Sequence, residues 1–280
     1  MRVPMSANIV LLVVALILLG AQANAASTTS GPLVIQQKNV PVRITEPGSY
    51  VLASNLRVSD PAVNAIFVDT DNVTIDLNGF TIFGPERGPV GSGSAVNTSV
   101  KDNVVVKNGG VRGFYDPAAA CIHLPGVNNR VENVRVQSCP QQAIFVGCAS
   151  VIIDCQVSSS GSGINTDGTA QVVNNTFFDT GGYCIQTYGG RPNCTGGALV
   201  MSNTCNRSQP GGLGIRVVGP GHRIESNVIT GVEIGIDLSE SEGSFFAKNL
   251  LYGVSVPFVD AEDDVDGADV DPSLANIIVP

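Results

Sequence analysis

Apolar residues along the chain recur in short alternating stretches, and these stretches repeat at a regular interval. A small residue followed by Ile or Val marks each repeat, at Ala65-Ile66, Cys121-Ile122, Ala143-Ile144, Gly163-Ile164, Cys184-Ile185, Gly214-Ile215 and Gly235-Ile236. One more repeat, around Ala95-Val96, lies in the longest gap of this series. A second apolar stretch follows later in each repeat and contains an acid or amide, at Asp76, Asn108, Asn133, Asp154, Asn175, Asn203, Asn227 and Asn249.

This pattern predicts a solenoid built of strands. The apolar positions alternate over a few residues, which is typical of strands, and no stretch of useful length has helical periodicity. Strands that return about every 20–24 residues, without a crossover helix, must wind as stacked coils. We therefore predict an all-β chain, a single-stranded right-handed parallel β-helix of about eight coils. The recurring Asn and Asp residues are expected to form one hydrogen-bonded ladder, with a structural role.

Other repeat folds of similar period do not match the sequence. The L-x-x-L-x-L frame of leucine-rich repeats, the W-D signature of propellers and the glycine–aspartate nonapeptide of calcium-binding β-rolls are all missing from the sequence. The β-helix is therefore preferred over a leucine-rich repeat, a propeller or a β-roll.

The two ends of the chain differ from the repeats. Residues 1–25 are predicted to be an export signal, with Arg2, the apolar run Ile9–Leu19 and the triplet Ala23-Asn24-Ala25 as a cleavage site. The run is too short for a stop-transfer span, so no membrane span is expected after cleavage. Residues 26–60 are predicted as an N-terminal cap, 61–254 as the β-helix, and 255–280 as an acidic loop and C-terminal cap. We expect a secreted protein, extracellular or periplasmic.

Charge and cysteine content narrow the partners. The net charge of −9 argues against nucleic acid as a partner. Seven cysteines in an exported chain can form disulfides, and the odd number leaves at least one free thiol, with the pairing undetermined. No C-x-x-C pair is present, and no cofactor or metal is predicted, with Ca²⁺ on Asp264, Asp266 and Asp269 as the alternative. The sequence gives no indication of the oligomeric state.

Two rows of outward side chains follow if the recurring isoleucines point inward. The first row is Phe67, His123, Phe145, Asn165, Gln186, Arg216 and Asp237, and the second is Asp69, Pro125, Gly147, Asp167, Tyr188, Val218 and Ser239. Stacked coils lie about 4.8 Å apart. Asp167 should then lie beside Tyr188, and Arg216 should lie beside Asp237. The distance from Asp167 to Arg216 should be about 10 Å, or two strand spacings.

These rows supply the candidate site. Asp167, Arg216 and Tyr188 are the candidate catalytic residues, and the candidate substrate-binding residues are His123, Phe145, Asn165, Gln186 and Asp237. An aromatic ring can stack on a sugar, while the polar groups bond its hydroxyls. The alternative is a solvated sheet face, on which Arg216 and Asp237 form a surface ion pair of small energetic value. The other histidine, His222 in GPGHR, is predicted to be a solvated turn residue.

Several segments resemble a known group of proteins. TEPGSYVLASNL, NAIFVDTDNVTIDLNGFTIFG, VKNGGVRGF and the closing DPSLANI are similar to segments of secreted bacterial pectate-lyase-like β-helix proteins. The resemblance covers roughly residues 40–280 and implies the β-helix fold and export. It does not select an activity, because this superfamily includes lyases, hydrolases, epimerases and adhesins.

A narrower similarity connects part of the chain to polygalacturonases. Asn165-Thr166-Asp167-Gly168 is similar to their N-T-D motif, whose Asp takes part in acid–base hydrolysis, and similar segments also surround Cys184, Cys194 and Arg216. The chain departs from the motifs, however, at Gly182-Tyr183, where that family has two aspartates, at Ala198, where it has His, and at Val218, where it has Lys. Inverting hydrolysis needs two carboxylates, and only Asp167 remains.

Three functions stay open at the level of sequence. The first is a secreted β-helix protein that binds an extracellular or cell-envelope polysaccharide. The second is a carbohydrate-active enzyme, namely a polysaccharide lyase, a glycoside hydrolase or an epimerase, that acts on the outward sheet face. The third is a structural or adhesive surface protein. A deep groove with convergent acidic and basic side chains would favour the enzyme.

Overall fold

The computed structural model describes residues 31–85, 91–114, 120–189, 194–207, 211–260 and 262–280. Residues 32–280 form one compact unit. The predicted export signal, residues 1–25, lies outside the described residues. None of the helices in the described part is long and apolar enough to span a bilayer.

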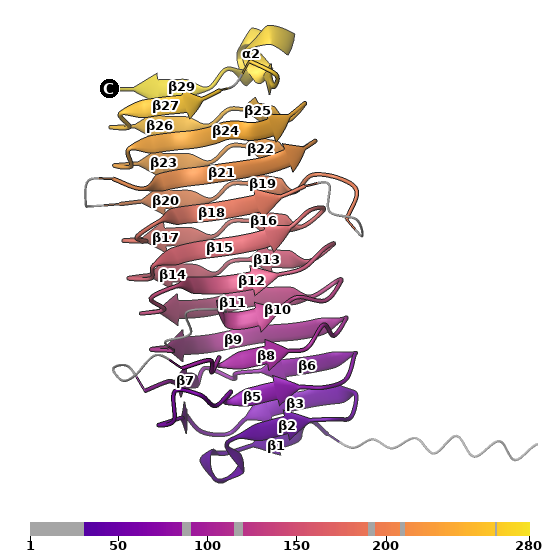
Figure 1. The fold of residues 1–280 in the computed structure, drawn as a ribbon. Coiled ribbons are helices and arrows are strands. Elements are labelled where there is room, and N and C mark those ends of the chain that lie inside the picture. The colour runs from indigo at the N-terminus through magenta and orange to yellow at the C-terminus, as the bar shows by residue number, and fades with distance from the viewer. Residues whose placement is uncertain (1–30, 86–90, 115–119, 190–193, 208–210, 261) are drawn as a thin grey trace, which may run out of the picture. The chain divides into compact units, whose positions relative to one another are not determined.

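Two parallel sheets wind around a common core. Sheet B has ten strands: β2 (Val42–Ile44), β5 (Ile66–Val68), β8 (Val96–Thr98), β10 (Ala120–Leu124), β12 (Gln142–Val146), β15 (Ser162–Asp167), β18 (Tyr183–Tyr188), β21 (Leu213–Pro220), β24 (Ile234–Glu242) and β27 (Val256–Val259). Figure 1 shows these coils stacked along one axis. The predicted fold class is confirmed: a parallel right-handed β-solenoid of about nine turns, close to the eight expected.

Sheet A has nineteen strands and covers the rest of each coil. Its strands are β1 (Leu33–Ile35), β3 (Gly48–Leu52), β4 (Leu56–Arg57), β6 (Val73–Asp76), β7 (Thr81–Phe83), β9 (Val104–Arg112), β11 (Arg130–Gln137), β13 (Val151–Ile153), β14 (Gln156–Ser158), β16 (Gln171–Val173), β17 (Thr176–Phe178), β19 (Leu199–Met201), β20 (Thr204–Asn206), β22 (Arg223–Glu225), β23 (Val228–Thr230), β25 (Phe245–Ala247), β26 (Leu250–Tyr252), β28 (Val265–Asp266) and β29 (Ile277–Val279). The short helices are η1 (Gln37–Asn39), α2 (Gly267–Val270) and η2 (Pro272–Leu274).

The recurring isoleucines form a continuous stack inside the solenoid. Strand register places one above another Ile66, Val96, Ile122, Ile144, Ile164, Ile185, Ile215 and Ile236. All eight side chains are buried. Because burial of such a side chain contributes about 1.5–3 kcal/mol, this stack fixes the register of sheet B. Residues that follow the isoleucines in sequence must then face away from the core.

The recurring Asn and Asp residues predicted from the repeat fall into two ladders, so the prediction of a single ladder is wrong. The inner ladder consists of the buried Asn175, Asn203, Asn227 and Asn249 and, at its end, the half-buried Asn276. From Asn203 onward, each side-chain oxygen accepts from the backbone N–H and the side-chain amide of the previous rung, at 2.9–3.0 Å. The outer ladder faces away from the core and consists of Asp76, Asn108, Asn133, and, further along, Asp154 with Asn174.

The two ladders lie on consecutive residues of the same turn. Asn174 has a left-handed backbone (φ 56°), and the next residue, Asn175, points into the core. Asn tolerates this conformation better than most residues because its short polar side chain bonds locally. Two adjacent positions in the turn therefore differ in burial, one at the surface and the next in the interior. The repeat period alone does not distinguish these two positions.

Six of the seven cysteines are paired. The disulfides join Cys121 to Cys139, Cys148 to Cys194, and Cys184 to Cys205. The remaining thiol, Cys155, is buried, and burial raises its pKa to about 12. Disulfides of this kind form and persist in oxidising compartments.

The acidic residues near the C-terminus hold the local backbone in place. Asp266 accepts from the backbone N–H of Ala268 (2.9 Å) and caps α2. Asp264 accepts from the hydroxyl of Ser241 (3.1 Å) and from the backbone N–H of Ser244 (2.6 Å). Within the described residues, no three His, Cys, Asp or Glu side chains are grouped so as to hold a metal, and this includes the calcium candidates Asp264, Asp266 and Asp269. The boundaries of the two caps stay predictions.

Candidate functional site

The outward face of sheet B carries one continuous row of side chains. Strand register aligns, from one end to the other, Arg43, Phe67, Asn97, His123, Phe145, Asn165, Gln186, Arg216, Asp237 and Val259. We call this the sheet B row. It contains every residue of the first row predicted from the sequence, in the predicted order. Neighbouring members lie about 4.8 Å apart because that is the spacing of paired strands.

The first half of the sheet B row contains three aromatic residues, Phe67, His123 and Phe145. The rings of His123 and Phe145 are stacked, with centroids 5.1 Å apart and an angle of 24° between their planes. The guanidinium of Arg43 lies 5.3 Å from the centroid of the Phe67 ring. All three ring residues are half-buried, so each keeps part of its surface accessible to a ligand.

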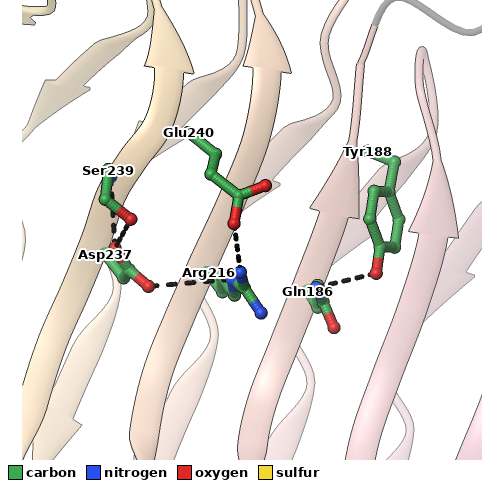
Figure 2. A network of polar contacts seen from close by, with 6 residues as sticks. All are labelled: Gln186, Tyr188, Arg216, Asp237, Ser239 and Glu240. Carbon is green, nitrogen blue, oxygen red and sulfur yellow. Dashed lines mark hydrogen bonds and ion pairs between the residues drawn. The ribbon is translucent and has the colours of Figure 1, made fainter.

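The middle of the row is polar and almost closed to solvent. Asn165 is 6% exposed and Gln186 is 4% exposed. The amide of Gln186 donates to the hydroxyl of Tyr188 (2.9 Å), as Figure 2 shows. Among the described residues, the side-chain oxygen of Asn165 has no hydrogen-bond partner. A buried amide oxygen without a partner costs about 1–3 kcal/mol, so this atom is an unsatisfied acceptor in the middle of the row.

Tyr183 lies beside this polar segment and contributes another hydroxyl. The amide of Gln142 donates to that hydroxyl at 3.0 Å. Burial raises the pKa of Tyr183, while hydrogen bonds from Gln142, Ser162 and Asn165 act in the opposite direction. The phenol therefore stays protonated at neutral pH and is available as a neutral donor or acceptor.

Arg216 is held by two carboxylates. Its guanidinium pairs with Asp237 (3.7 Å) and forms a closer ion pair with Glu240. Asp237 also accepts from the backbone N–H (3.1 Å) and the hydroxyl (2.7 Å) of Ser239, as drawn in Figure 2. The predicted neighbour Asp237 is thus confirmed, and Glu240 is a partner that sequence reasoning missed.

A register shift explains the missed partner. The pairing of β21 with β24 is irregular between Arg216 and Val218, so that Val218 lies beside Glu240. Strict alternation had placed Ser239 there, and that position is wrong. An irregularity adds a residue to one strand and turns the following side chains to the other face. The acidic pattern of SESE after Leu238 is a signal in the sequence, but it does not locate the shift.

The candidate catalytic residues come from adjacent strands. Asp167 and Tyr188 are direct partners on β15 and β18, and Arg216 follows on β21. Two strand spacings separate Asp167 from Arg216, about 10 Å. Asp237 lies three strands from Asp167, about 14 Å, whereas two hydrolytic carboxylates lie at most about 9.5 Å apart. These two acids therefore do not form a hydrolytic pair.

His222 is buried, and the prediction of a solvated turn residue is wrong. It is 1% exposed, and its Nδ1 accepts from the backbone N–H of Ala198 (3.0 Å). Its Nε2 lies 3.1 Å from the carbonyl oxygen of Val218. A backbone N–H can only donate, so Nδ1 carries no proton and Nε2 donates to Val218. Burial lowers the pKa of His222 and keeps this neutral form.

The fold and the side chains on it define a β-solenoid that exposes an ordered row of aromatic, amide and charged groups. The sequence profile of the family described as a right handed beta helix region matches residues 42–196, more than half of the chain. The protein belongs to this right-handed β-helix family. A comparison with curated protein sequences finds no match.

Solved structures share the same winding. The chain is similar to the A-module of the mannuronan C-5 epimerase AlgE4 of Azotobacter vinelandii, with 11% identity, a TM-score of 0.51, and coverage of 83% of this chain and 87% of that one. It is also similar to the Dettilon tailspike protein, with 14% identity, a TM-score of 0.57, and coverage of 89% of this chain and 60% of that one. At these identities the likeness shows the fold alone.

Proposed function

We propose that the protein binds a polysaccharide along the sheet B row, with the sugar chain parallel to the solenoid axis. The single observation that carries the proposal is the order of side chains in this row. An aromatic pair, His123 with Phe145, adjoins two nearly buried amides, Asn165 and Gln186, and these adjoin the charged Arg216. Rings stack on sugar faces and amides bond hydroxyls, so the row matches a chain of sugars.

The partners of Arg216 favour binding over a role as catalytic base. Two carboxylates neutralise its charge, and its guanidinium is held between β21 and β24. An arginine is not deprotonated in proteins, so it acts through its N–H donors. Arg216 is therefore assigned to holding sugar hydroxyls, in concert with Asp237.

Catalysis at Asp167 and Tyr188 is the second candidate function. The two residues are direct neighbours across β15 and β18, and both are half-buried beside the amide segment of the row. A carboxylate next to a phenol can take and return a proton on one sugar. A polysaccharide epimerase shares this fold, which is the reason to test for a lyase, a hydrolase or an epimerase.

We further propose that the protein is secreted and works on an extracellular or cell-envelope polysaccharide, as pectate-lyase-like proteins do. Three disulfides and the signal-like N-terminal sequence support export.

A polysaccharide panel tests the proposal. The purified protein is run through native gels that contain single polysaccharides, and retardation reports binding. Phe145→Ala should abolish most of the retardation, because it removes half of the stacked pair. Phe178→Ala is the matched control, since Phe178 is an exposed aromatic that lies on sheet A. Binding to none of the polymers, or equal loss in the two variants, would overturn the proposal.

The same samples decide between binding and catalysis. Reducing ends report hydrolysis, unsaturated ends report a lyase, and deuterium uptake from the solvent at a sugar carbon reports an epimerase. If the protein is an enzyme, Asp167→Asn should abolish product formation while retardation persists. Product that survives both Asp167→Asn and Tyr188→Phe would show that the reaction occurs elsewhere.

A further inference from the structure

A separate cavity lies on the outer surface of sheet A, away from the sheet B row. Its volume is about 580 Å³, and it is lined by residues of β6, β7, β9 and β11 and of the turn between β6 and β7. This volume falls in the range of about 300–1,000 Å³ that is typical of ligand pockets. The lining residues that matter for binding are Asp76, Phe83, Gly110, Asn133, Arg135 and Gln137.

The cavity exists because one side chain is missing from an outward row of sheet A. Register aligns Thr81 on β7, Gly110 on β9 and Arg135 on β11. Gly110 adds no side chain to this row, and a Cβ there would lie 2.7 Å from the hydroxyl of Thr81, so a larger residue would displace Thr81 and narrow the cavity. The preceding glycine, Gly109, has a packing role, because a Cβ there would lie 2.4 Å from the Cβ of Leu77.

Arg135 gives the cavity an accessible positive charge. Its side chain is exposed, and no carboxylate within the described residues forms an ion pair with it. By contrast, acidic partners pair with Arg43, Arg130, Arg216 and Arg223. A guanidinium presents two parallel N–H donors that match the two oxygens of a carboxylate.

The opposite wall presents acceptors and amides. Asp76 accepts from the amide of Asn108 (3.2 and 3.3 Å) and from the backbone N–H of Asn78 (2.8 Å). These donors stabilise its charge, but the carboxylate still repels a second anion. The lining also includes Arg112, so a ligand that fits both walls carries a negative charge toward Arg135 and hydroxyl donors toward Asp76.

An aromatic side chain completes the cavity. Phe83 lines it, and the guanidinium of Arg57 lies 4.2 Å from the centroid of that ring, which fixes the ring in place. The C–H face of a sugar packs against such a ring.

We propose that this cavity binds an acidic sugar, that is, a saccharide unit that carries a carboxylate. The carboxylate pairs with Arg135, the hydroxyls bond Asp76, Asn133 and Gln137, and the ring packs on Phe83. The site is independent of the sheet B row and is built on the other sheet.

Calorimetric titration of the full chain tests the proposal. The probes are the disaccharides of galacturonate, glucuronate and mannuronate, their neutral hexose counterparts, and acetate. We expect at least one acidic disaccharide to bind at least tenfold more tightly than its neutral counterpart and than acetate. Equal binding of acidic and neutral sugars, equal binding of acetate, or no binding of any acidic probe would overturn the proposal.

Variants locate the binding. Arg135→Gln should weaken the binding of the acidic disaccharide at least tenfold. Arg223→Ala, which removes an exposed arginine elsewhere on sheet A, should leave that affinity unchanged. Gly110→Val should block binding by filling the cavity, and an unchanged unfolding midpoint shows that the variant is folded. Unaltered affinity in a folded Arg135→Gln variant refutes the site.

Discussion

The inner asparagine ladder makes a strong prediction about stability. The side chain of Asn227 makes four hydrogen bonds: its oxygen accepts twice from Asn203, and its amide donates to Val200 and Asn249. Asn227 is 1% exposed, so water does not replace these bonds when the side chain is removed. Each bond contributes about 1 kcal/mol net, and orphaned buried partners add to the loss. We expect Asn227→Ala to lower the free energy of unfolding by about 3–4 kcal/mol.

The outer ladder supplies a matched control. Asn174 is exposed, makes one side-chain bond to Asp154 and has a left-handed backbone (φ 56°). Asn174→Ala should cost about 1 kcal/mol, mostly because alanine tolerates that backbone less well. Urea unfolding followed by circular dichroism measures both variants in the oxidised protein. If Asn227→Ala loses no more stability than Asn174→Ala, the buried bonds of the inner ladder do not stabilise the fold.

Three further predictions follow from buried groups. Burial lowers the pKa of His222 below its usual value of 6.5. Below pH 6.5 the unfolded state therefore binds a proton that the folded state does not, and the melting temperature should fall as the pH decreases. The variant His222→Gln should lose this component of the pH dependence, whereas His123→Gln should retain it. Cys155, whose pKa is raised to about 12, should not react with a thiol reagent in the native protein. In denaturant without reductant, the reagent should detect one thiol per chain. A reaction in the native state would contradict the burial of Cys155. Gly163→Ala would place a Cβ 2.1 Å from the carbonyl oxygen of Cys184 and should cost at least about 1–3 kcal/mol in urea unfolding; a neutral result means that β15 and β18 are not packed as described.

The candidate site was predictable wherever alternation is regular. Each Ile of the buried stack in sheet B is followed by an outward residue, so the order from Phe67 to Asp237 follows from the sequence. The neighbours Asp167 and Tyr188 follow by the same rule. Alternation fails after Arg216, where the pairing shifts and Glu240 replaces Ser239. Such a shift depends on how two whole strands pair, and no short pattern encodes it.

The sequence by itself determined the winding of this protein, because the recurring small-Ile pairs leave only a stacked coil as a way to bury their side chains. It also determined which residues face outward on sheet B. Only the tertiary structure decided which side chains from different coils are in contact. The pairing of six cysteines, the burial of His222 between Ala198 and Val218, and the cavity at Gly110 all join residues from different coils. The physical reason is that register and local shifts are set by the whole stack, while the repeat sets only its period.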